Sequence, residues 1–427
     1  MRNWFKLDNA ATIYPSVISK KAPNVYRLSV TLKDIINIDN LQLALEKALK
    51  KFHYFQVFLK KGFFWYYFER TSKVPELEPE FCYPCRDLKI KKNRFLFRII
   101  PYFNRIAIET THALTDGFGA LVFLKAILVE YLNITYGPFN GYEKDIYNFN
   151  VENEDEFLDP FKRFKKSTIR KPEKQDKGWK LPFQKTNPFY YYVTQFLLET
   201  DQVKKIAKSF KGTINDFLVT NYIYTFYKIY KSLPKKLQKY DKYKIRAVVP
   251  VNLRQFYKSD SFKNFAFIVA PFIDPALGDY SFEEIFKKVH HFIRLYANNK
   301  DLLPELTRNV NSQYNWVIRL MPIFIKDFVL KIAYSIFADR PITSSMSNLG
   351  NVKIDDRMKK YIKNFDFIPA PPVGVKIGAG VIGFENVLSI NIGRVYKEPI
   401  FERIFIDNLK KFDLKVKINA NYEYSWL

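Results

Sequence analysis

The stretch from Arg105 to Leu128 constrains the fold most, because it joins two different hydrophobic periodicities through a polar loop. Residues 105–109 alternate in polarity as a half-buried strand does, and residues 120–128 form an apolar helical run. The loop between them reads Thr110-Thr111-His112-Ala113-Leu114-Thr115-Asp116-Gly117-Phe118-Gly119. A strand that turns directly into an apolar helix predicts an α/β unit with His112 held in the connecting loop.

Strands and helices alternate along the rest of the chain as well. In the first half we expect strands at 25–32, 94–100 and 105–110, a helix at 41–52 starting at Asp39-Asn40, and a hairpin made of 55–59 and 63–68. In the second half we expect strands at 190–199, 245–250, 266–272, 373–377 and 387–392, helices at 217–230, 282–298, 321–337 and 399–412, and a polar turn at 342–350. This order predicts an α/β protein with mixed sheets.

Residues 140–190 interrupt this pattern. An acidic cluster at 152–156 is followed by a basic stretch, 162–185, that contains Pro172 and Pro182 and has little apolar periodicity. Such a segment is typical of a surface crossing. In a chain of 427 residues it predicts an N-terminal lobe at 1–150, a crossing segment at 151–189 and a C-terminal lobe at 190–427.

The net charge of +26 raises the question of an anionic partner. The basic residues are scattered and no nucleic-acid-binding motif is found, so a lysine-rich solvated surface is the simplest interpretation. A phosphate-bearing ligand is the alternative, and we expect no nucleic-acid partner. Cys82 and Cys85 are the only cysteines and supply two of the four ligands of a structural zinc site, so no metal site is expected.

The first residues, Met1 to Asp8, lack the apolar core of a signal peptide, and the few cysteines favour a reducing compartment. We therefore expect a cytoplasmic protein. No run of about 18 uncharged apolar residues suggests a membrane-spanning helix. The most apolar candidate, residues 316–337, is interrupted by charges and predicts a core-facing helix. An amphipathic surface helix with peripheral membrane contact is the alternative.

The segment Thr111 to Gly117 resembles the chloramphenicol acetyltransferase superfamily, whose members share His-x-x-x-Asp-Gly between a strand and a helix. Condensation domains, alcohol acetyltransferases and wax-ester synthases are among them. Three further segments are similar to members of this group and follow in family order: Thr213-Ile214-Asn215-Asp216, Val249-Pro250-Val251-Asn252-Leu253-Arg254 and Ser347-Asn348-Leu349-Gly350. The opening, Trp4 to Ala11, looks like that of alcohol acetyltransferase-like members.

Two departures limit the resemblance. Thr111 stands where many members have a first histidine, and no Asp-Phe-Gly-Trp-Gly stretch is present, which argues against the plant-type branch. The resemblance implies two chloramphenicol acetyltransferase-like lobes, each a mixed sheet packed with helices, with an active-site tunnel between them. It also implies transfer of an acyl group, acetyl being the expected one, from acyl-CoA to a small or apolar alcohol. Acyl-CoA would be a co-substrate, with no permanently bound cofactor. A monomer is compatible with this activity.

The residues of the loop suit such a reaction. With an ordinary pKa of about 6.5, the imidazole of His112 can take the proton of an acceptor hydroxyl as general base. The resemblance implies that Asp116 points away from the substrate and braces the loop through an arginine, for which Arg254 is the candidate. We expect Gly117 to allow a tight turn into the helix.

The second lobe is expected to contribute the rest of the site. Ser347 and Asn348 are candidates for stabilising the oxyanion of the tetrahedral intermediate, or else cap neighbouring backbone. Asn215 and Asp216 are second-lobe motif positions at a helix start, and either is a candidate cap. The remaining histidines, His53, His290 and His291, are interpreted as structural.

Two other functions stay open at this point. The chain is also compatible with a condensation-type enzyme that forms amides or esters. From another class of protein, a catalytically inactive binding scaffold of the same fold is the remaining alternative. Acyl transfer to an alcohol is preferred over both on the resemblance of the opening stretch.

Overall fold

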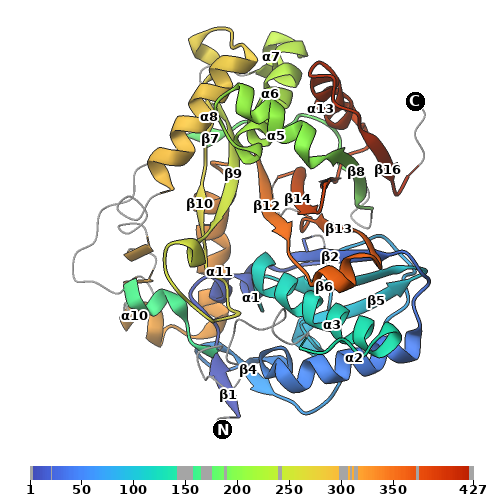
Figure 1. Cartoon of the computed structure of the whole chain (residues 1–427). Coiled ribbons are helices and arrows are strands. Elements are labelled where there is room, and N and C mark those ends of the chain that lie inside the picture. Colours follow the sequence, from blue (N-terminus) through green and yellow to red (C-terminus); the bar gives the residue numbers. More distant parts are fainter. Residues whose placement is uncertain are drawn as a thin grey trace.

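The computed structural model describes residues 3–20, 22–141, 157–164, 176–186, 190–238, 243–297, 306–307, 310–311, 316–371 and 375–422. Two lobes, each built on its own sheet, lie one above the other (Figure 1). The predicted α/β class is confirmed, and the second-lobe sheet is mixed as expected, whereas the first-lobe sheet is antiparallel throughout. The tunnel between the lobes stays a prediction. The predicted crossing segment, 151–189, and the acidic cluster within it fall largely outside the described residues.

The first lobe is a four-stranded antiparallel sheet covered on one face by two helices (Figure 1). The sheet order is β13-β2-β6-β5, with bounds Ile362–Ile368, Val25–Leu32, Arg105–Thr111 and Phe97–Tyr102. The two helices are α2 (Ile38–Lys51) and α3 (Gly117–Tyr136), and both bury apolar side chains in the first core. A smaller sheet combines β1 (Trp4–Lys6) with the predicted hairpin, β3 (Val57–Lys61) and β4 (Tyr66–Arg70).

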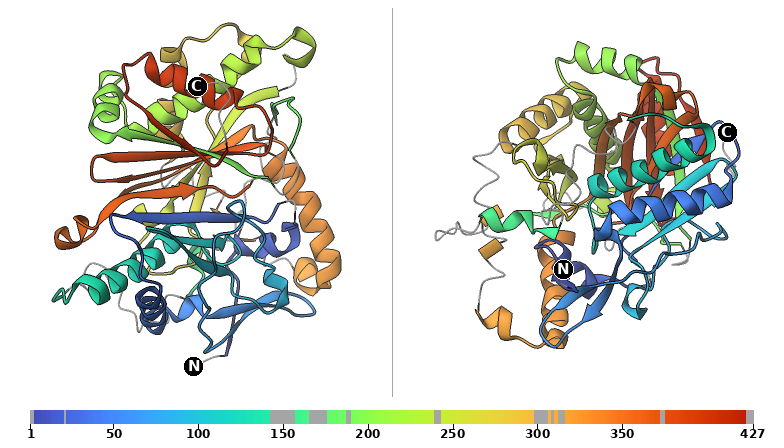
Figure 2. Two further views of the ribbon diagram at one scale, coloured as in Figure 1. Left: turned by 90° about the vertical axis from the view of Figure 1, so that its right-hand side faces the viewer. Right: turned by 60° about the horizontal axis from the view of Figure 1, so that its bottom comes forward.

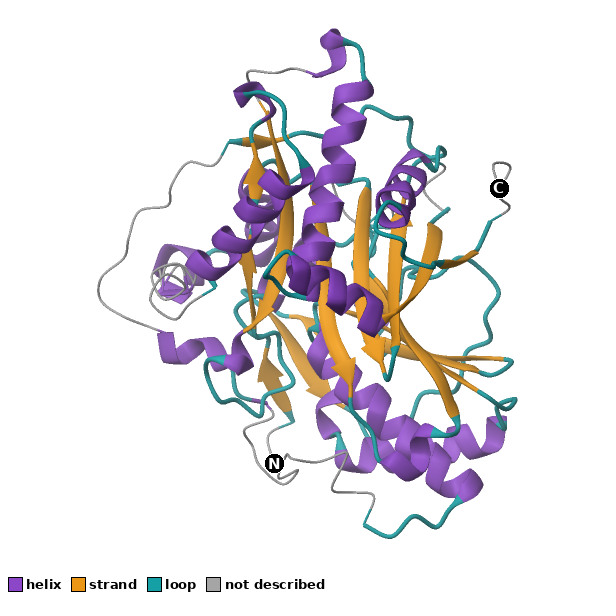
Figure 3. Ribbon diagram, turned by 45° about the horizontal axis from the view of Figure 1, so that its top comes forward, coloured by secondary structure: helices purple, strands orange, loops and turns teal. Residues whose placement is uncertain are grey.

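The second lobe is a larger mixed sheet with helices packed on it (Figure 3). Its strand path runs β10 (Ala266–Val269), β9 (Tyr243–Asn252), β12 (Ser344–Val352), β14 (Ile377–Phe384), β15 (Val387–Arg394), β8 (Tyr192–Glu199) and β16 (Lys417–Ala420), and β7 (Lys177–Gly178) and β11 (Phe272–Ile273) also pair with β9. The second core involves α5 (Thr200–Ser209), α6 (Ile214–Ser232), α8 (Phe282–Tyr296) and α13 (Ile400–Lys410). The other described α-helices are α1 (Tyr14–Val17), α7 (Lys235–Gln238), α10 (Trp316–Leu320), α11 (Ile323–Ala333) and α12 (Asp356–Lys359).

Strand β13 comes from the C-terminal part of the chain but completes the sheet of the first lobe. It pairs antiparallel with β2, so that Phe367 lies opposite Leu28. Its Asp366 turns toward the second lobe, where the Ser389 hydroxyl donates to it at 2.6 Å. The range 190–427 assigned to the second lobe therefore includes a strand of the first.

The predicted polar turn at 342–350 is wrong, because Ser344–Val352 is strand β12 in the middle of the large sheet. It pairs in parallel with β9 on one side and β14 on the other, which satisfies its backbone groups. Its small polar residues are accommodated because Ser345 and Ser347 lie opposite Gly378 and Gly380. Serine-rich sequence usually favours turns, and here the tertiary pairing outweighs that preference.

Two predicted helix starts are also corrected. The side chain of Asn37, not that of Asp39 or Asn40, caps α2 by accepting from the Asn40 backbone amide at 2.9 Å. At α6 the cap is Thr213, which forms a capping box with Asp216. Neither Asn215 nor Asp216 is therefore the N-cap residue itself.

Helix α3 is the one described helix that is long and apolar enough to cross a membrane by length and composition, contrary to the sequence expectation. The most apolar 18-residue stretch of this helix is 67% buried inside the protein, between α2 and the first-lobe sheet. Burial in a core accounts for the same composition, so this helix is weak evidence for a membrane span.

Candidate active site

The imidazole of His112 lies in the loop between β6 and α3 and is partly buried against two tyrosines. The Tyr26 ring centroid is 4.7 Å from it, and the Tyr14 ring stacks at 5.5 Å with an interplanar angle of 27°. The Tyr26 hydroxyl also donates to the Thr115 carbonyl at 3.0 Å, so that this ring holds the loop as well as the imidazole.

The backbone of this loop is fixed from both lobes. The Tyr54 hydroxyl donates to the Leu114 carbonyl at 2.6 Å, and the Thr115 hydroxyl donates to the Phe262 carbonyl at 2.6 Å. The Asn264 side-chain amide donates to the His112 carbonyl at 3.0 Å. Since Phe262 and Asn264 follow strand β9 of the second lobe, the loop is set at the seam between the lobes.

Burial lowers the pKa of His112 below its ordinary value of 6.5, and the nearby negative charge of Asp116 only partly offsets this effect. The imidazole is consequently neutral at pH 7. A neutral imidazole can accept a proton, which is the protonation state that a general base needs.

The carboxylate of Asp116 is fully engaged within the fold. It caps α3 by accepting from the Gly119 amide at 2.9 Å, and its other oxygen accepts from the Phe265 amide at 2.9 Å. That second oxygen also accepts from the Arg254 guanidinium at 2.8 Å. The structure thus brings together Asp116 and the arginine suggested by the sequence, in a pair whose side chains are 10% and 7% exposed.

The guanidinium of Arg254 binds more than this one carboxylate. It donates to the backbone carbonyls of Ser261 and Lys263 at 2.8 and 2.7 Å, and it lies 4.7 Å from the centre of the Phe118 ring. One side chain from the end of β9 therefore connects the His112 loop to the segment that carries Asn264. This is an ordering role, and it involves no contact with the imidazole among the contacts of the described residues.

Gly117 was expected to allow a tight turn into the helix, but it is not among the described glycines with positive φ, so its backbone conformation does not require glycine. A Cβ atom at Gly117 would lie 2.9 Å from a methyl group of Leu349, so this glycine allows strand β12 to approach the loop. Gly119 is more tightly enclosed. A Cβ atom there would lie 2.2 Å from the Thr115 hydroxyl and 2.7 Å from the Phe262 carbonyl.

Strand β12 carries both oxyanion candidates, and alternation places them on opposite faces. Leu349, the residue that meets Gly117, follows two positions after Ser347, where the pairing of β12 with β14 becomes irregular between Asn348 and Asn351. Asn348 points the other way, and its side-chain amide donates to the Asn215 side chain at 3.3 Å. The structure therefore brings Asn348 and Asn215 together, whereas Ser347 lies two residues before the point where β12 meets the His112 loop.

Asp216 has a structural environment. It is buried, and one of its carboxylate oxygens accepts from the Thr213 amide at 2.9 Å and from the Arg294 guanidinium at 3.1 Å. His290 contacts the same oxygen at 3.2 Å. These bonds tie the start of α6 to α8, which agrees with the structural interpretation of His290.

Sequence reasoning missed Tyr14, Tyr26 and Asn264, because none of them lies in a motif or next to His112 in the chain. It also missed Asp8, whose carboxylate accepts from the Asn264 side chain at 3.0 Å. Burial and the charge of Asp159 raise the pKa of Asp8 to about 7. Only the resemblance of the opening stretch, Trp4 to Ala11, pointed to this part of the chain.

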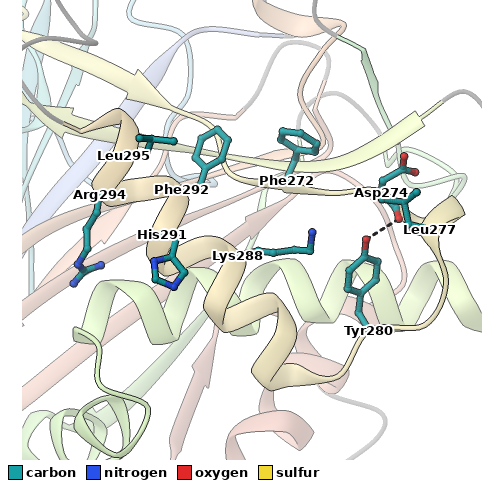
Figure 4. Close-up of a pocket in the computed structure, with 9 residues that line it drawn as sticks. All are labelled: Phe272, Asp274, Leu277, Tyr280, Lys288, His291, Phe292, Arg294 and Leu295. Atoms are coloured by element: carbon teal, nitrogen blue, oxygen red, sulfur yellow. Dashed lines mark hydrogen bonds between the residues drawn. The ribbon is translucent and has the colours of Figure 1, made fainter.

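A hollow of about 640 Å³ opens elsewhere, on the second lobe (Figure 4). Figure 4 shows that its walls come from α8, β11 and the turn between them, with Phe272, Tyr280, Lys288 and Phe292 among the lining residues. No residue of the His112 loop lines it. Among the described residues, no group of three or more His, Cys, Asp or Glu side chains is placed to hold a metal ion.

The chain has the two-lobed architecture that the resemblance implied. Solved structures with this architecture match the chain over nearly its whole length. F. graminearum TRI101, solved with coenzyme A and deoxynivalenol, has a TM-score of 0.64 and 10% identity, covering 97% of this chain and 99% of that one. TRI3 trichothecene 15-O-acetyltransferase from Fusarium sporotrichioides has a TM-score of 0.61 and 10% identity, covering 96% and 94%.

The condensation domain of the monacolin K polyketide synthase MokA is similar too, with a TM-score of 0.55, 8% identity and 96% of each chain covered. At such low identities these likenesses establish the fold. No family model and no curated protein matches the sequence.

Proposed function

We propose that the chain is an acyl-CoA-dependent acyltransferase that transfers an acyl group, acetyl being the expected one, to an alcohol, with His112 as general base. The observation that carries this proposal is the state of the His112 loop. Its imidazole is kept neutral by burial, while the Asp116 carboxylate is occupied by two backbone amides and Arg254. The loop therefore holds a single base in a fixed place instead of an acid–base pair.

The proposed reaction has two steps. His112 takes the proton of the acceptor hydroxyl as its oxygen attacks the thioester carbonyl, which gives a tetrahedral intermediate. The intermediate then collapses, the carbon–sulfur bond breaks, and the leaving CoA thiolate receives the proton from His112. Base catalysis of this kind contributes typically about 10²–10⁴-fold, and no covalent enzyme intermediate is needed.

Coenzyme A is proposed as the acyl carrier because a structure similar to this chain was solved with it. TRI101 is solved with coenzyme A, and TRI3 is an O-acetyltransferase by its name. Ser347 is proposed as the oxyanion donor. Its support is the approach of β12 to Gly117 through Leu349, which follows Ser347 by two residues on the same strand.

Release of free CoA tests the proposal. Purified protein is offered acetyl-CoA and longer acyl-CoAs with a panel of alcohols, and the free thiol is measured. His112→Ala should abolish release while leaving the thermal unfolding transition close to that of the wild type. His53→Ala is the matched control, because His53 is an exposed histidine outside the loop. Undiminished release by His112→Ala contradicts the proposal.

A condensation-type enzyme is the second candidate, favoured by the likeness to the MokA condensation domain. It predicts activity with amine acceptors or with carrier-bound acyl thioesters and little with acyl-CoA and alcohols. A wild-type protein that is silent on all these panels supports the binding scaffold instead.

A further inference from the structure

Helix α11 turns polar side chains toward the protein and large apolar side chains toward solvent, the opposite of the usual orientation of a surface helix. Two of its three charged residues, Lys326 and Asp327, face the protein. Asp327 accepts from the Ser16 hydroxyl at 2.6 Å and from the Tyr66 hydroxyl at 3.0 Å. Lys326 is buried, donates to the Phe64 carbonyl at 2.8 Å and lies 3.3 Å from the centre of the Trp65 ring. These specific bonds fix the rotation of the helix about its axis.

Because the polar side chains are held inward, the apolar ones point outward. The sequence prediction of a core-facing helix is therefore wrong, and the amphipathic surface helix is observed with its apolar side in solvent. Exposed large apolar residues continue onto α10 and onto the tip of the β3–β4 hairpin, where the Phe63 carbonyl accepts from the Ile323 amide at 2.9 Å. We call this surface the apolar ridge and define it by Phe63, Trp316, Leu320, Phe324, Phe328 and Ile332.

The ridge lies at the periphery of the molecule. Figure 2 shows the orange segment that carries α10 and α11 running along the outer edge of the protein. Scattered apolar residues are normal on protein surfaces, but a continuous set of this size marks a contact surface. Helix α10 has 5 residues, and α11 has 11 and continues into a π-helical stretch of 6 residues, Tyr334–Asp339, so that both are shorter than the about 20 residues that span a bilayer.

The exposed charges on α10 and α11 have one sign. Within residues 316–337 the only acid is Asp327, and it is turned inward. The charged side chains that remain exposed on α10 and α11 are the cations Arg319 and Lys331. The whole chain carries a net charge of +26. Aromatic and aliphatic residues flanked by cations are the composition of helices that lie in the interface of an anionic membrane.

We propose that the apolar ridge docks this protein on the surface of an anionic phospholipid bilayer, with α10 and α11 lying in the plane of the interface. Charge complementarity and the outward apolar side favour a bilayer over an acidic protein, which would leave the aromatic side chains without an apolar partner. The ridge is also attached to the candidate active site. Asp327 is bound by Ser16 of α1, and Tyr14 of the same short helix stacks on His112.

Vesicle flotation tests the proposal directly and does not depend on enzymatic activity. The full chain is mixed with vesicles of phosphatidylcholine, with and without phosphatidylglycerol, and the bound fraction is measured. We expect binding to the anionic vesicles. Phe324→Asp with Phe328→Asp should weaken it roughly ten-fold or more, because both side chains are about two thirds exposed, at 65% and 66%, on the ridge.

Two further variants distinguish membrane binding through the ridge from attraction by the net charge of the protein. Ile35→Asp with Leu277→Asp makes the same charge change at residues that are 76% and 74% exposed outside the ridge, and it should bind as the wild type does. Arg319→Glu with Lys331→Glu should lose binding to anionic vesicles selectively. Thermal unfolding confirms that each variant is folded.

Three outcomes would overturn the proposal. The first is a wild-type protein that binds neither kind of vesicle. The second is equal loss of binding in the ridge variant and the control variant, which would indicate attraction by net charge alone. The third is a dimer in light scattering that Phe324→Asp with Phe328→Asp dissociates, which would indicate that a second copy of this chain covers the ridge.

Discussion

Replacing Asp116 by asparagine tests the central structural argument. The carboxylate accepts bonds from the Gly119 and Phe265 amides and from Arg254, and an asparagine amide group would face one or more of these donors. Arg254 would also lose the negative charge beside it, at a site where its side chain is 7% exposed. Removing one partner of a buried pair costs about 3–5 kcal/mol. We expect Asp116→Asn to lower the free energy of unfolding by about that amount.

Urea denaturation of four proteins measures this effect: the wild type, Asp116→Asn, Arg254→Met and the double variant. The two residues should show a coupling energy within the range of about 0.5–3 kcal/mol found for contacting residues. The negative charge of Asp116 raises the pKa of His112, so its removal should also shift the acid limb of the activity profile to lower pH. A loss of stability below about 1 kcal/mol, with additive single effects, would refute the assigned role of the pair.

Other consequences follow from the same loop. Burial lowers the pKa of His112 below 6.5, so kcat/KM should stay level down to about pH 6.5 and fall only at lower pH. Below that pH the unfolded chain binds a proton that the folded protein disfavours, so the urea midpoint should decrease as the pH falls, and His112→Ala should reduce this decrease. Gly119→Ala should cost about 1–3 kcal/mol in thermal unfolding, because its Cβ atom would overlap Thr115. Gly117→Ala should cost less, because it meets only the flexible end of Leu349, and equal losses at both glycines would contradict this reasoning.

The sequence predicted the first half of the site well, because its residues are contiguous. A strand, a loop and an apolar helix in succession place His112 and Asp116 by local rules alone. The pairing of Asp116 with Arg254 spans 138 residues and came from the resemblance, since no periodicity links two positions so far apart.

The second half could not be predicted in the same way. Tyr14 and Asn264 reach His112 only through the tertiary fold, and nothing in their local sequence marks them. Residues 344–352 have the composition of a turn and become a central strand, because glycines on β14 provide the space beside their serines. Local preference is a weak guide wherever strands from distant segments decide the packing.

The prediction that α11 faces the core was wrong for a different physical reason. The periodicity of residues 323–333 is that of an amphipathic helix, and a soluble protein would turn the apolar side inward. Ser16 and Tyr66 instead hold Asp327 against the protein, so the rotation of the helix is decided by buried polar bonds. The periodicity of a sequence predicts that a helix has an apolar face. Whether that face points to the core or to solvent depends on partners elsewhere in the chain.

Strand β13 makes the two lobes inseparable as pieces of polypeptide. A fragment that ends near residue 150 would leave the edge of β2 without its neighbour, and bare strand edges promote aggregation. Co-expressing the two halves would succeed only if the second half delivered Ile362–Ile368 to the first. The same strand opposes a hinge-like opening between the lobes, because its Asp366 accepts a hydrogen bond from Ser389 of β15 and an opening would break that bond. Relative movement of the two sheets is therefore coupled to the loss of the polar contacts between β13 and the second lobe.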